Sequence, residues 1–152
     1  MRYVRYVAEG WGVGELVLDG AALVHHDAPH GSGVCGGEPR VPLAERLREY
    51  FAGERDTFTD VRLDLDAFTP FQRAVCGTLR AVPYGEVVTY AELAALAGHP
   101  NAQRAVGTFC AHNRFSIVVP CHRVVAADGI GSYGSSGVAY KRRLLELEGV
   151  AL

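Results

Sequence analysis

The sequence predicts an α/β protein of two domains: a small domain of strands and one helix over residues 1–67, and a mainly helical domain over residues 68–152. The first observation behind this prediction is a series of short strand patterns with glycine-rich turns before residue 66. The second is a succession of helix patterns that begins at Thr69 and Pro70. A length of 152 residues is enough for two small domains.

The predicted N-terminal domain contains strands, then a helix, then a further strand. Residues 2–29 read as short strands separated by glycine turns. In "PLAERLREYFAGE" (42–54), the apolar residues recur at helical spacing and Gly53 ends the pattern. The stretch "FTDVRLDLDAFTP" (58–70) alternates between apolar and polar residues, which predicts a strand.

The predicted C-terminal domain opens with three helices. The first covers residues 69–82, with Thr69 as the capping residue and Pro70 at the first helical position. The second covers residues 89–98, capped by Thr89 and ended by Gly98, and the third covers residues 99–113. Two helices joined by a short turn with glycine are typical of a helix-turn-helix, although spacing alone favours a plain helical hairpin.

The rest of the domain is predicted to combine a buried strand, a loop and a closing helix. The strand is "SIVVP" (116–120), the Gly/Ser-rich loop is "AADGIGSYGSSG" (126–137), and the helix is "VAYKRRLLELEG" (138–149).

Composition narrows the functional classes. The chain has a formal net charge of −2 and 49% hydrophobic residues, so DNA contact would need a local basic patch. No apolar run approaches the roughly 20 residues of a membrane helix, and the N-terminus lacks the apolar core of a signal peptide. We therefore expect a cytoplasmic protein without membrane contact. Its four cysteines form no CxxC pair, so free thiols are expected.

The stretch "IVVPCHRVV" (117–125) is the strongest sign of chemistry, because it interrupts an apolar run with a cysteine beside a histidine. A thiol becomes nucleophilic when a neighbouring base or positive charge favours its ionisation. Adjacent strand residues point to opposite faces, so a turn after Pro120 is needed to bring Cys121 and His122 into one site. A histidine base also needs an acceptor to orient it, and Glu146 and Glu148 are both candidates.

Two alternatives compete with a reactive thiol. Cys121 could be a small buried hydrophobic residue, which is the commonest role of an arbitrary cysteine. His25, His26, His30 and Cys35 lie close together in the sequence and are all possible zinc ligands. Their spacing matches no standard zinc motif, so we predict a polar glycine-rich loop there and neither metal nor cofactor.

Three motifs in this order resemble the O6-alkylguanine-DNA alkyltransferases, also called methylated-DNA–protein-cysteine methyltransferases. They are "VPYGEVVTYAELAALAG" (82–98), "NAQRAVG" (101–107) and "IVVPCHRVV" (117–125), and the resemblance runs from about Thr69 to Gly149. It implies an RNase H-like N-terminal domain and a C-terminal domain with a winged helix-turn-helix-like motif and an active-site cysteine turn. Residues 1–65 resemble the family only in length and in the order of their elements.

The function implied by the resemblance is direct repair of DNA. Such a protein binds double-stranded DNA as a monomer, turns an O6-alkylguanine out of the stack and transfers the alkyl group irreversibly to its own cysteine. O4-alkylthymine is a further candidate substrate, and the DNA would place the protein at the nucleoid. Phosphate contacts should supply most of the affinity.

The resemblance also assigns the site residues. Cys121 is implied as the alkyl acceptor, His122 as the base acting through a water, and Glu148 as the carboxylate that orients His122. Tyr90 is implied as the proton donor to the departing guanine and as a DNA contact that helps turn the nucleotide, and Asn113 as a brace of the active-site turn. Arg123 is expected to be structural and to tie the turn to the body of the domain.

The implied DNA contacts and pocket come from other positions. Arg104 would fill the vacated stack, and the small residues Ala102, Ala105 and Gly107 would let the recognition helix approach the minor-groove floor. The carbonyl of Val124 would accept from the guanine amine. Other expected pocket residues are Tyr133, Gly134, Ser135 and Cys110.

Two features depart from the family pattern. The pocket loop usually reads close to G-Y-x-G-G, whereas residues 132–137 read "SYGSSG", so Tyr133 comes one residue early. This shift weakens the assignment of Ser135, whose backbone N–H would face guanine O6, and small residues at Gly134–Gly137 predict a roomier pocket. Cys110 stands where an apolar residue is common, and it could either pack or react as a second thiol.

Two rival functions can be weighed on the same residues. A lesion-sensing DNA-binding protein of the alkyltransferase-like kind lacks the acceptor cysteine, so the presence of Cys121 argues against it. A Cys-His-Glu hydrolase is a second rival. The adjacency of Cys121 and His122 and the pairing of Tyr90 with Arg104 do not fit a hydrolase.

Overall fold

The computed structural model describes residues 1–33 and 41–152. Within them the chain forms two compact units. The first unit contains Met1–Asp64 together with Arg114–Ser116, and the second contains Leu65–Asn113 and Ile117–Leu152. The division therefore lies at Asp64–Leu65 rather than at residue 67, and a short segment from the second half joins the first unit. Each unit is described separately below.

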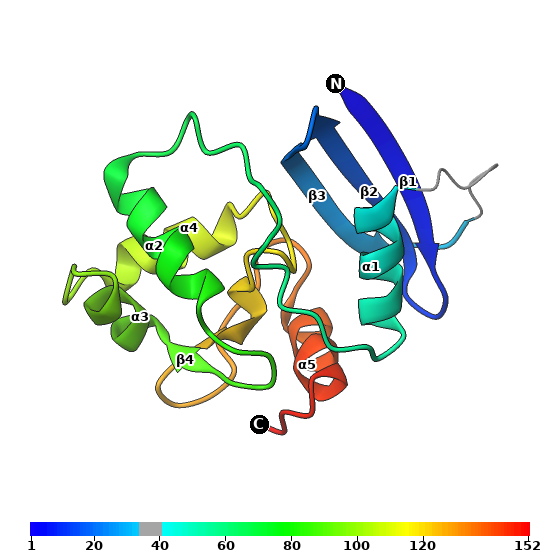
Figure 1. Cartoon of the computed structure of the whole chain (residues 1–152). Helices are drawn as coiled ribbons and strands as arrows, with labels where there is room; N and C mark the ends of the chain where they lie inside the picture. Colours follow the sequence, from blue (N-terminus) through cyan, green and yellow to red (C-terminus); the bar gives the residue numbers. More distant parts are fainter. Residues whose placement is uncertain (34–40) are drawn as a thin grey trace. The chain divides into compact units, whose positions relative to one another are not determined.

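The first unit is built on a three-stranded antiparallel sheet in the order β1-β2-β3 (Figure 1). The strands are β1 (Arg2–Ala8), β2 (Gly12–Asp19) and β3 (Ala22–His30). Alternation places Val4, Tyr6 and Ala8 on the buried face of β1, as expected for a sheet with one solvated side.

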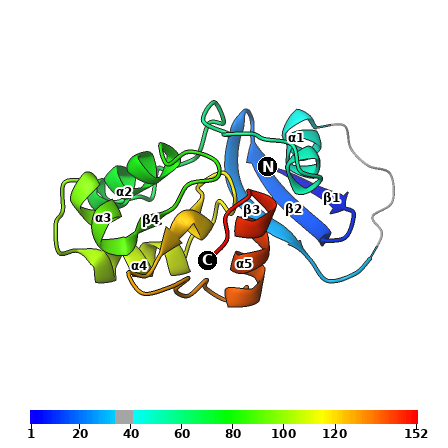
Figure 2. The same cartoon turned by 90° about the horizontal axis from the view of Figure 1, so that it is seen from below.

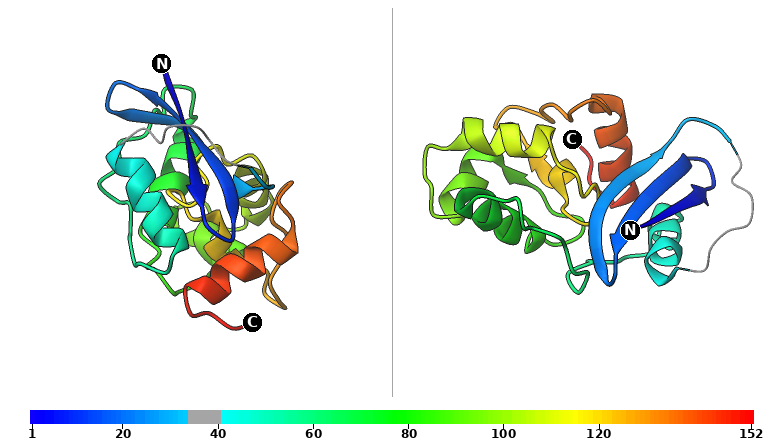
Figure 3. Two further views of the ribbon diagram at one scale, coloured as in Figure 1. Left: turned by 90° about the vertical axis from the view of Figure 1, so that its right-hand side faces the viewer. Right: turned by 90° about the horizontal axis from the view of Figure 1, so that it is seen from above.

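One helix, α1 (Pro42–Phe51), covers a face of this sheet (Figure 3). Leu47, Tyr50 and Phe51 are its buried large residues, which matches the predicted helical spacing. The Trp11 indole N–H donates to the Phe51 carbonyl at 3.1 Å and so ties the β1–β2 turn to the end of the helix.

The strand predicted over residues 58–70 is wrong. Only Leu63 bridges to the sheet, at Leu23, and the rest of the segment is irregular. Arg46 explains the difference, because its guanidinium binds both Asp56 and Asp60, at 2.8 and 2.9 Å. Phe58 has a φ of 53° and residues 59–60 form a turn, so the chain is bent where the strand was predicted to begin.

The second unit is mainly helical, as predicted, and α2, α3 and α4 lie together (Figure 2). Thr69 and Thr89 each form a capping box at the start of a helix, which confirms both predicted caps. The helices are shorter at their ends than the sequence predicted: they are α2 (Pro70–Arg80), α3 (Tyr90–Leu96), α4 (Gln103–Ala111) and α5 (Val138–Leu147).

A two-stranded parallel pairing that the sequence did not predict positions the start of α3. Strand β4 (Val88–Thr89) pairs with β5 (Val124–Val125), with Thr89 opposite Val125. Tyr90 follows β4 directly, and β5 follows the Cys-His-Arg turn. The pairing therefore brings the first residue of α3 close to the turn that contains Cys121 and His122.

The strand predicted over residues 116–120 is also wrong, because this apolar stretch forms a buried turn. Ile117 has a φ of 72°, a conformation that costs a β-branched residue about 1–3 kcal/mol. The run is apolar because it is buried, and the period of two that defines a strand is absent.

No described helix is both long and apolar enough to cross a membrane.

Candidate active site

Cys121 opens a single turn of 3-10 helix, η1 (Cys121–Arg123), immediately after Pro120. The Cys121 amide donates to the Val119 carbonyl at 2.8 Å, and only 3% of the residue is exposed. The turn that the sequence required after Pro120 is therefore present. It directs consecutive residues into one buried region instead of to opposite faces of a strand.

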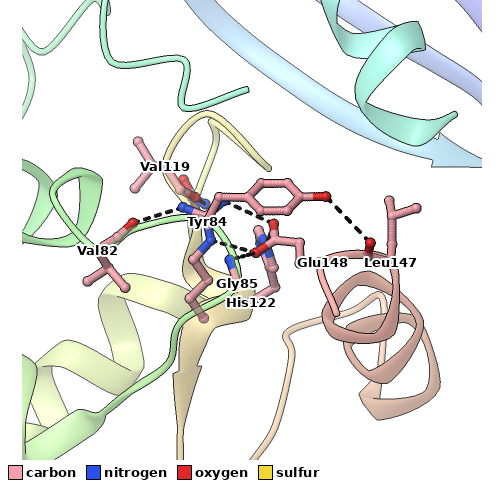
Figure 4. Close-up of polar contacts among 9 residues, drawn as sticks. Val82, Tyr84, Gly85, Val119, His122, Leu147 and Glu148 are labelled. Carbon is pink, nitrogen blue, oxygen red and sulfur yellow. Dashed lines mark hydrogen bonds and ion pairs between the residues drawn. The ribbon is translucent and has the colours of Figure 1, made fainter. Parts of the chain in front are cut away.

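His122 and Glu148 form a buried pair that joins η1 to the end of α5 (Figure 4). The distance from His122 Nε2 to a Glu148 carboxylate oxygen is 2.7 Å. Glu146, the other candidate, is exposed on the same helix. The structure thus brings Glu148, and not Glu146, to His122.

Arg123 completes this charged network. Its guanidinium donates to both Glu148 oxygens, at 2.9 and 3.0 Å, and to the Val82 carbonyl at 2.9 Å. It also lies over the Tyr84 ring, 5.7 Å from the centroid. The amide of Gly85 donates to the same carboxylate at 3.1 Å. The expectation that Arg123 ties the turn to the body of the domain is confirmed.

The charges of this network follow from its hydrogen bonds. Burial works against ionisation of Glu148, but the donors on His122 and Arg123 outweigh it and hold the pKa of Glu148 well below its usual range. Burial lowers the pKa of His122, against the effect of the carboxylate, so the ring is neutral near pH 7. Because a carboxylate only accepts, Nε2 carries the His122 proton and Nδ1 is the basic nitrogen.

Asn113 braces the turn from the end of α4. Its side-chain amide donates to the Val119 carbonyl at 2.9 Å, the same oxygen that accepts from the Cys121 amide. The bond places Asn113 beside the turn that carries Cys121.

A small cavity of about 10 Å³ lies next to Cys121. This volume holds roughly one water molecule. Burial, followed by contact with Cys110, raises the pKa of the Cys121 thiol well above its ordinary value. The thiol is therefore neutral near pH 7 and needs a base before it can attack. The cavity is lined by Tyr90, Gly107, Cys110, Ala111, Cys121, Ser132, Tyr133 and Gly134.

Lys141 is a site residue that the sequence reasoning missed. Its ammonium is buried and donates to the carbonyls of Val124, at 2.5 Å, and Ser132, at 2.9 Å. It also lies 5.7 Å from the centroid of the Tyr90 ring. Burial lowers its pKa to about 8. One signal was available, because Lys141 is the single lysine of the chain.

Tyr90 stands at the cavity with its hydroxyl protonated. Burial raises its pKa above the ordinary value, and the hydroxyl donates to the Ser132 carbonyl at 3.4 Å. Gly131 passes close to the ring with a φ of 76°, and an added Cβ would come within 3.3 Å of the tyrosine. A side chain at residue 131 would therefore push Tyr90 away from the cavity.

The prediction of a roomier pocket concerns the wall that Tyr133 and Gly134 form beside Cys121. Tyr133 and Gly134 do form part of the wall, but the space they leave is small. Gly134 has a φ of 43°, and a Cβ there would meet the backbone of Ala111, which also lines the cavity, at 3.3 Å. Ser135 is exposed and does not line the cavity.

The predicted DNA contacts lie on α4, the second helix of the pair α3–α4. Arg104 and Ala105 are exposed near its start, and Gly107, one turn further on, reaches the cavity wall. Val106 and Phe109 face the core, so α4 offers one polar, small-residue face to solvent.

The proposed zinc ligands are not gathered around a metal site. His26 is buried with its two ring nitrogens at Tyr6 and Ser116, whereas His25 is exposed. His30 pairs with Asp27 at 2.9 Å. Cys35 lies outside the described residues, and among those that are described no group of three potential ligands occurs.

Comparison with known proteins identifies the family. Residues 70–150, more than half of the chain, match the family described as "6-O-methylguanine DNA methyltransferase, DNA binding domain". The chain belongs to this family.

A methylated-DNA–protein-cysteine methyltransferase of Mycobacterium tuberculosis is 50% identical over 105 residues, which are 68% of this chain and 62% of that protein. A Shigella flexneri protein of the same name is 46% identical over 110 residues, 72% of this chain and 64% of that protein. The chain thus spans less than two thirds of the length of these relatives.

Solved structures of the methyltransferase family extend the likeness to both units. The Mycobacterium tuberculosis OGT structure in complex with DNA superposes with a TM-score of 0.81 and 36% identity, covering 98% of this chain and 93% of that one. The O6-methylguanine-DNA methyltransferase of Pyrococcus kodakaraensis gives a TM-score of 0.73 and 30% identity, covering 97% and 98% of the two chains. The N-terminal fold, which the motifs left open, therefore belongs to the same family.

Proposed function

We propose that this protein repairs DNA by transferring the alkyl group of O6-alkylguanine irreversibly to Cys121. The observation that carries the proposal is the buried Cys121–His122–Glu148 arrangement beside a cavity that Tyr90 also lines. Family membership and the DNA complex of the Mycobacterium tuberculosis relative support it. The compartment that this function implies is the cytoplasm, at the nucleoid.

Activation of the thiol is the first step. The Cys121 proton would pass through a water to Nδ1 of His122, while Glu148 stabilises the imidazolium that forms. The high pKa of the resting thiol supports this order, because it keeps Cys121 neutral until a substrate is in place.

Transfer then exchanges one bond for another. The Cys121 sulfur attacks the alkyl carbon, the bond from that carbon to O6 breaks, and the electron pair leaves with the guanine. A guanine anion is a poor leaving group, so Tyr90 would supply a proton as it departs. The raised pKa of Tyr90 supports this assignment, because the hydroxyl carries its proton at neutral pH. The thioether product does not revert, so each molecule reacts once.

Access to the lesion would depend on α4. The base must leave the stack to reach Cys121, which costs a few kcal/mol. Arg104 would occupy the vacated space with a planar group and hydrogen-bond donors, while Ala105 and Gly107 let the helix approach the groove. Inside the pocket, the Val124 carbonyl would accept from the guanine amine, beside Lys141.

Weighing the protein by mass spectrometry after incubation with a duplex carrying one O6-methylguanine tests the function. The proposal predicts an irreversible gain of one methyl group by the wild type. The Cys121→Ser variant should gain none but still bind the duplex, because serine ionises far less readily. Reversible binding without a gain in mass would indicate a lesion sensor instead. The absence of both binding and mass gain would favour the Cys-His-Glu hydrolase.

A further inference from the structure

His26, on β3 of the first unit, is a buried histidine to which the reaction assigns no role. Only 1% of it is exposed. The Tyr6 hydroxyl is 2.7 Å from Nε2, and the Ser116 carbonyl is 2.5 Å from Nδ1. The Tyr6 ring also stacks on the imidazole, with the centroids 5.9 Å apart. A histidine held this closely at both nitrogens has one fixed orientation.

The partners also fix the tautomer. A carbonyl oxygen only accepts, so Nδ1 carries the proton and donates to Ser116, and Nε2 accepts from the Tyr6 hydroxyl. Burial lowers the pKa of His26 to about 4, so the ring stays neutral at physiological pH. The hydrogen bond to Ser116 is therefore a permanent feature of the folded protein.

The Ser116 carbonyl lies at the entrance to the active-site turn. Residues Arg114–Ser116 group with the first unit, and the His26 amide donates to the Arg114 carbonyl at 2.8 Å. The Ser116 oxygen and the Ile117 nitrogen belong to one planar peptide group. Because the imidazole holds the Ser116 oxygen, it fixes the orientation of this peptide plane. The φ angle of Ile117 is the rotation about the N–Cα bond that leaves the plane.

Ile117 needs such support. Its φ of 72° is a strained conformation for a β-branched side chain, and it persists only where neighbouring contacts impose it. On its C-terminal side, the Val119 carbonyl is held by Asn113 at 2.9 Å and by the Cys121 amide at 2.8 Å. On its N-terminal side, the contact of the Ser116 carbonyl is with His26.

We propose that His26 is a positioning residue for the alkyl transfer: by holding the Ser116–Ile117 peptide, it sets the turn that carries Cys121. This rests on the proposed function of Cys121. It assigns a role to a residue of β3, a part of the sequence in which the motifs showed no chemistry. His26 acts only through the backbone and does not touch the substrate.

Two amide variants separate this role from a general contribution to folding. In His26→Asn the amide nitrogen takes roughly the position of Nδ1 and can still donate to Ser116. In His26→Gln the amide lies at the position of Nε2 and the donor to Ser116 is lost. Tyr6→Phe is the matched control, because it removes a buried hydrogen bond from the same ring but leaves the Ser116 contact in place.

The measurements are single-turnover rates on a duplex carrying O6-methylguanine and on free O6-benzylguanine, with affinity for undamaged duplex and the melting temperature of each variant. We expect His26→Gln to slow both substrates by the same factor, about 10- to 100-fold, with DNA affinity unchanged. His26→Asn should recover most of the rate, and Tyr6→Phe should transfer near the wild-type rate despite a lower melting temperature.

Transfer by His26→Gln at the wild-type rate would overturn the proposal. So would an equal slowing by Tyr6→Phe at the same loss of melting temperature, since His26 would then only stabilise the fold. Failure of the wild type to transfer at all would instead contradict the function proposed for Cys121.

Discussion

His122 and His26 are both buried histidines, yet their neighbours give them opposite properties. His122, on η1, faces the Glu148 carboxylate and lies beside Arg123. His26, on β3, faces a phenol hydroxyl and a backbone carbonyl. Burial lowers the pKa of both rings. The difference lies in which nitrogen keeps the proton and in whether a positive charge could be tolerated.

The comparison shows that two buried histidines of one fold can serve different roles, one in proton transfer and the other in holding the backbone. The carboxylate holds the proton of His122 on Nε2 and would stabilise the ring if Nδ1 accepted a second proton. The Ser116 carbonyl holds the proton of His26 on Nδ1, and burial outweighs the support that this carbonyl and Asp27 would give to a positive charge. One histidine is thus suited to move a proton and the other to hold a backbone in place.

The largest effect should come from removing the charge beside His122. We expect Glu148→Gln to lower the transfer rate by about 10³-fold, because a neutral amide neither stabilises the imidazolium nor enforces the tautomer. Single-turnover kinetics at a temperature where the variant is folded would measure this. Glu146→Gln, on an exposed position of the same helix, is the control. Equal losses in the two variants would remove Glu148 from the mechanism.

The second effect concerns stability in acid, over the pH range in which histidines titrate, and His26 should contribute to it. Its pKa is about 4 in the folded protein against 6.5 as the ordinary value, so its contribution is fully present above pH 6.5. That contribution is lost as the pH falls from 6.5 towards 4, by about 3 kcal/mol in the free energy of unfolding. The lowered pKa of His122 acts in the same direction, whereas Glu148 acts only below pH 4.5.

Urea unfolding at a series of pH values would test this loss. His26→Asn should flatten the dependence between pH 6.5 and 4, because asparagine does not titrate. An unchanged dependence in that variant would mean that the His26 ring is not buried as a neutral group.

The smallest effect should come from replacing Arg104, which is not part of the His122–Glu148 pair. We expect Arg104→Ala to slow repair of a methylated duplex by about 10- to 100-fold, because the gap left by the turned-out base is no longer filled. The reaction with free O6-benzylguanine, which needs no extrusion, should change little. Arg142→Ala, on α5, is the control. An equal loss on duplex and on free base would assign Arg104 to the fold instead.

Much of the second unit could be predicted from local sequence. Thr69 and Thr89 were recognised as caps because capping depends on neighbouring residues alone. The turn at Cys121 followed from Pro120 and from the need to bring adjacent residues into one site. Glu148 was distinguished from Glu146 only by the family resemblance, since spacing on a helix does not reveal a distant partner.

What failed depends on contacts between residues far apart in the chain. The buried turn at Ile117 looks like a strand, because apolar composition reports burial and not backbone angle. The pairing of Val88 with Val124 is too short to leave a pattern. Lys141 went unrecognised because its partners are backbone carbonyls, which no sequence displays.

The central claim is that the sulfur of Cys121 receives the alkyl group, and peptide mapping by mass spectrometry tests it most directly. The wild type would be incubated with a duplex carrying one O6-methylguanine and then digested. The account predicts the methyl group on the peptide that contains Cys121, and an unchanged result in a Cys110→Ser variant. A methyl group on Cys110 or Cys76 would contradict it, because a thiol other than Cys121 would then be the acceptor.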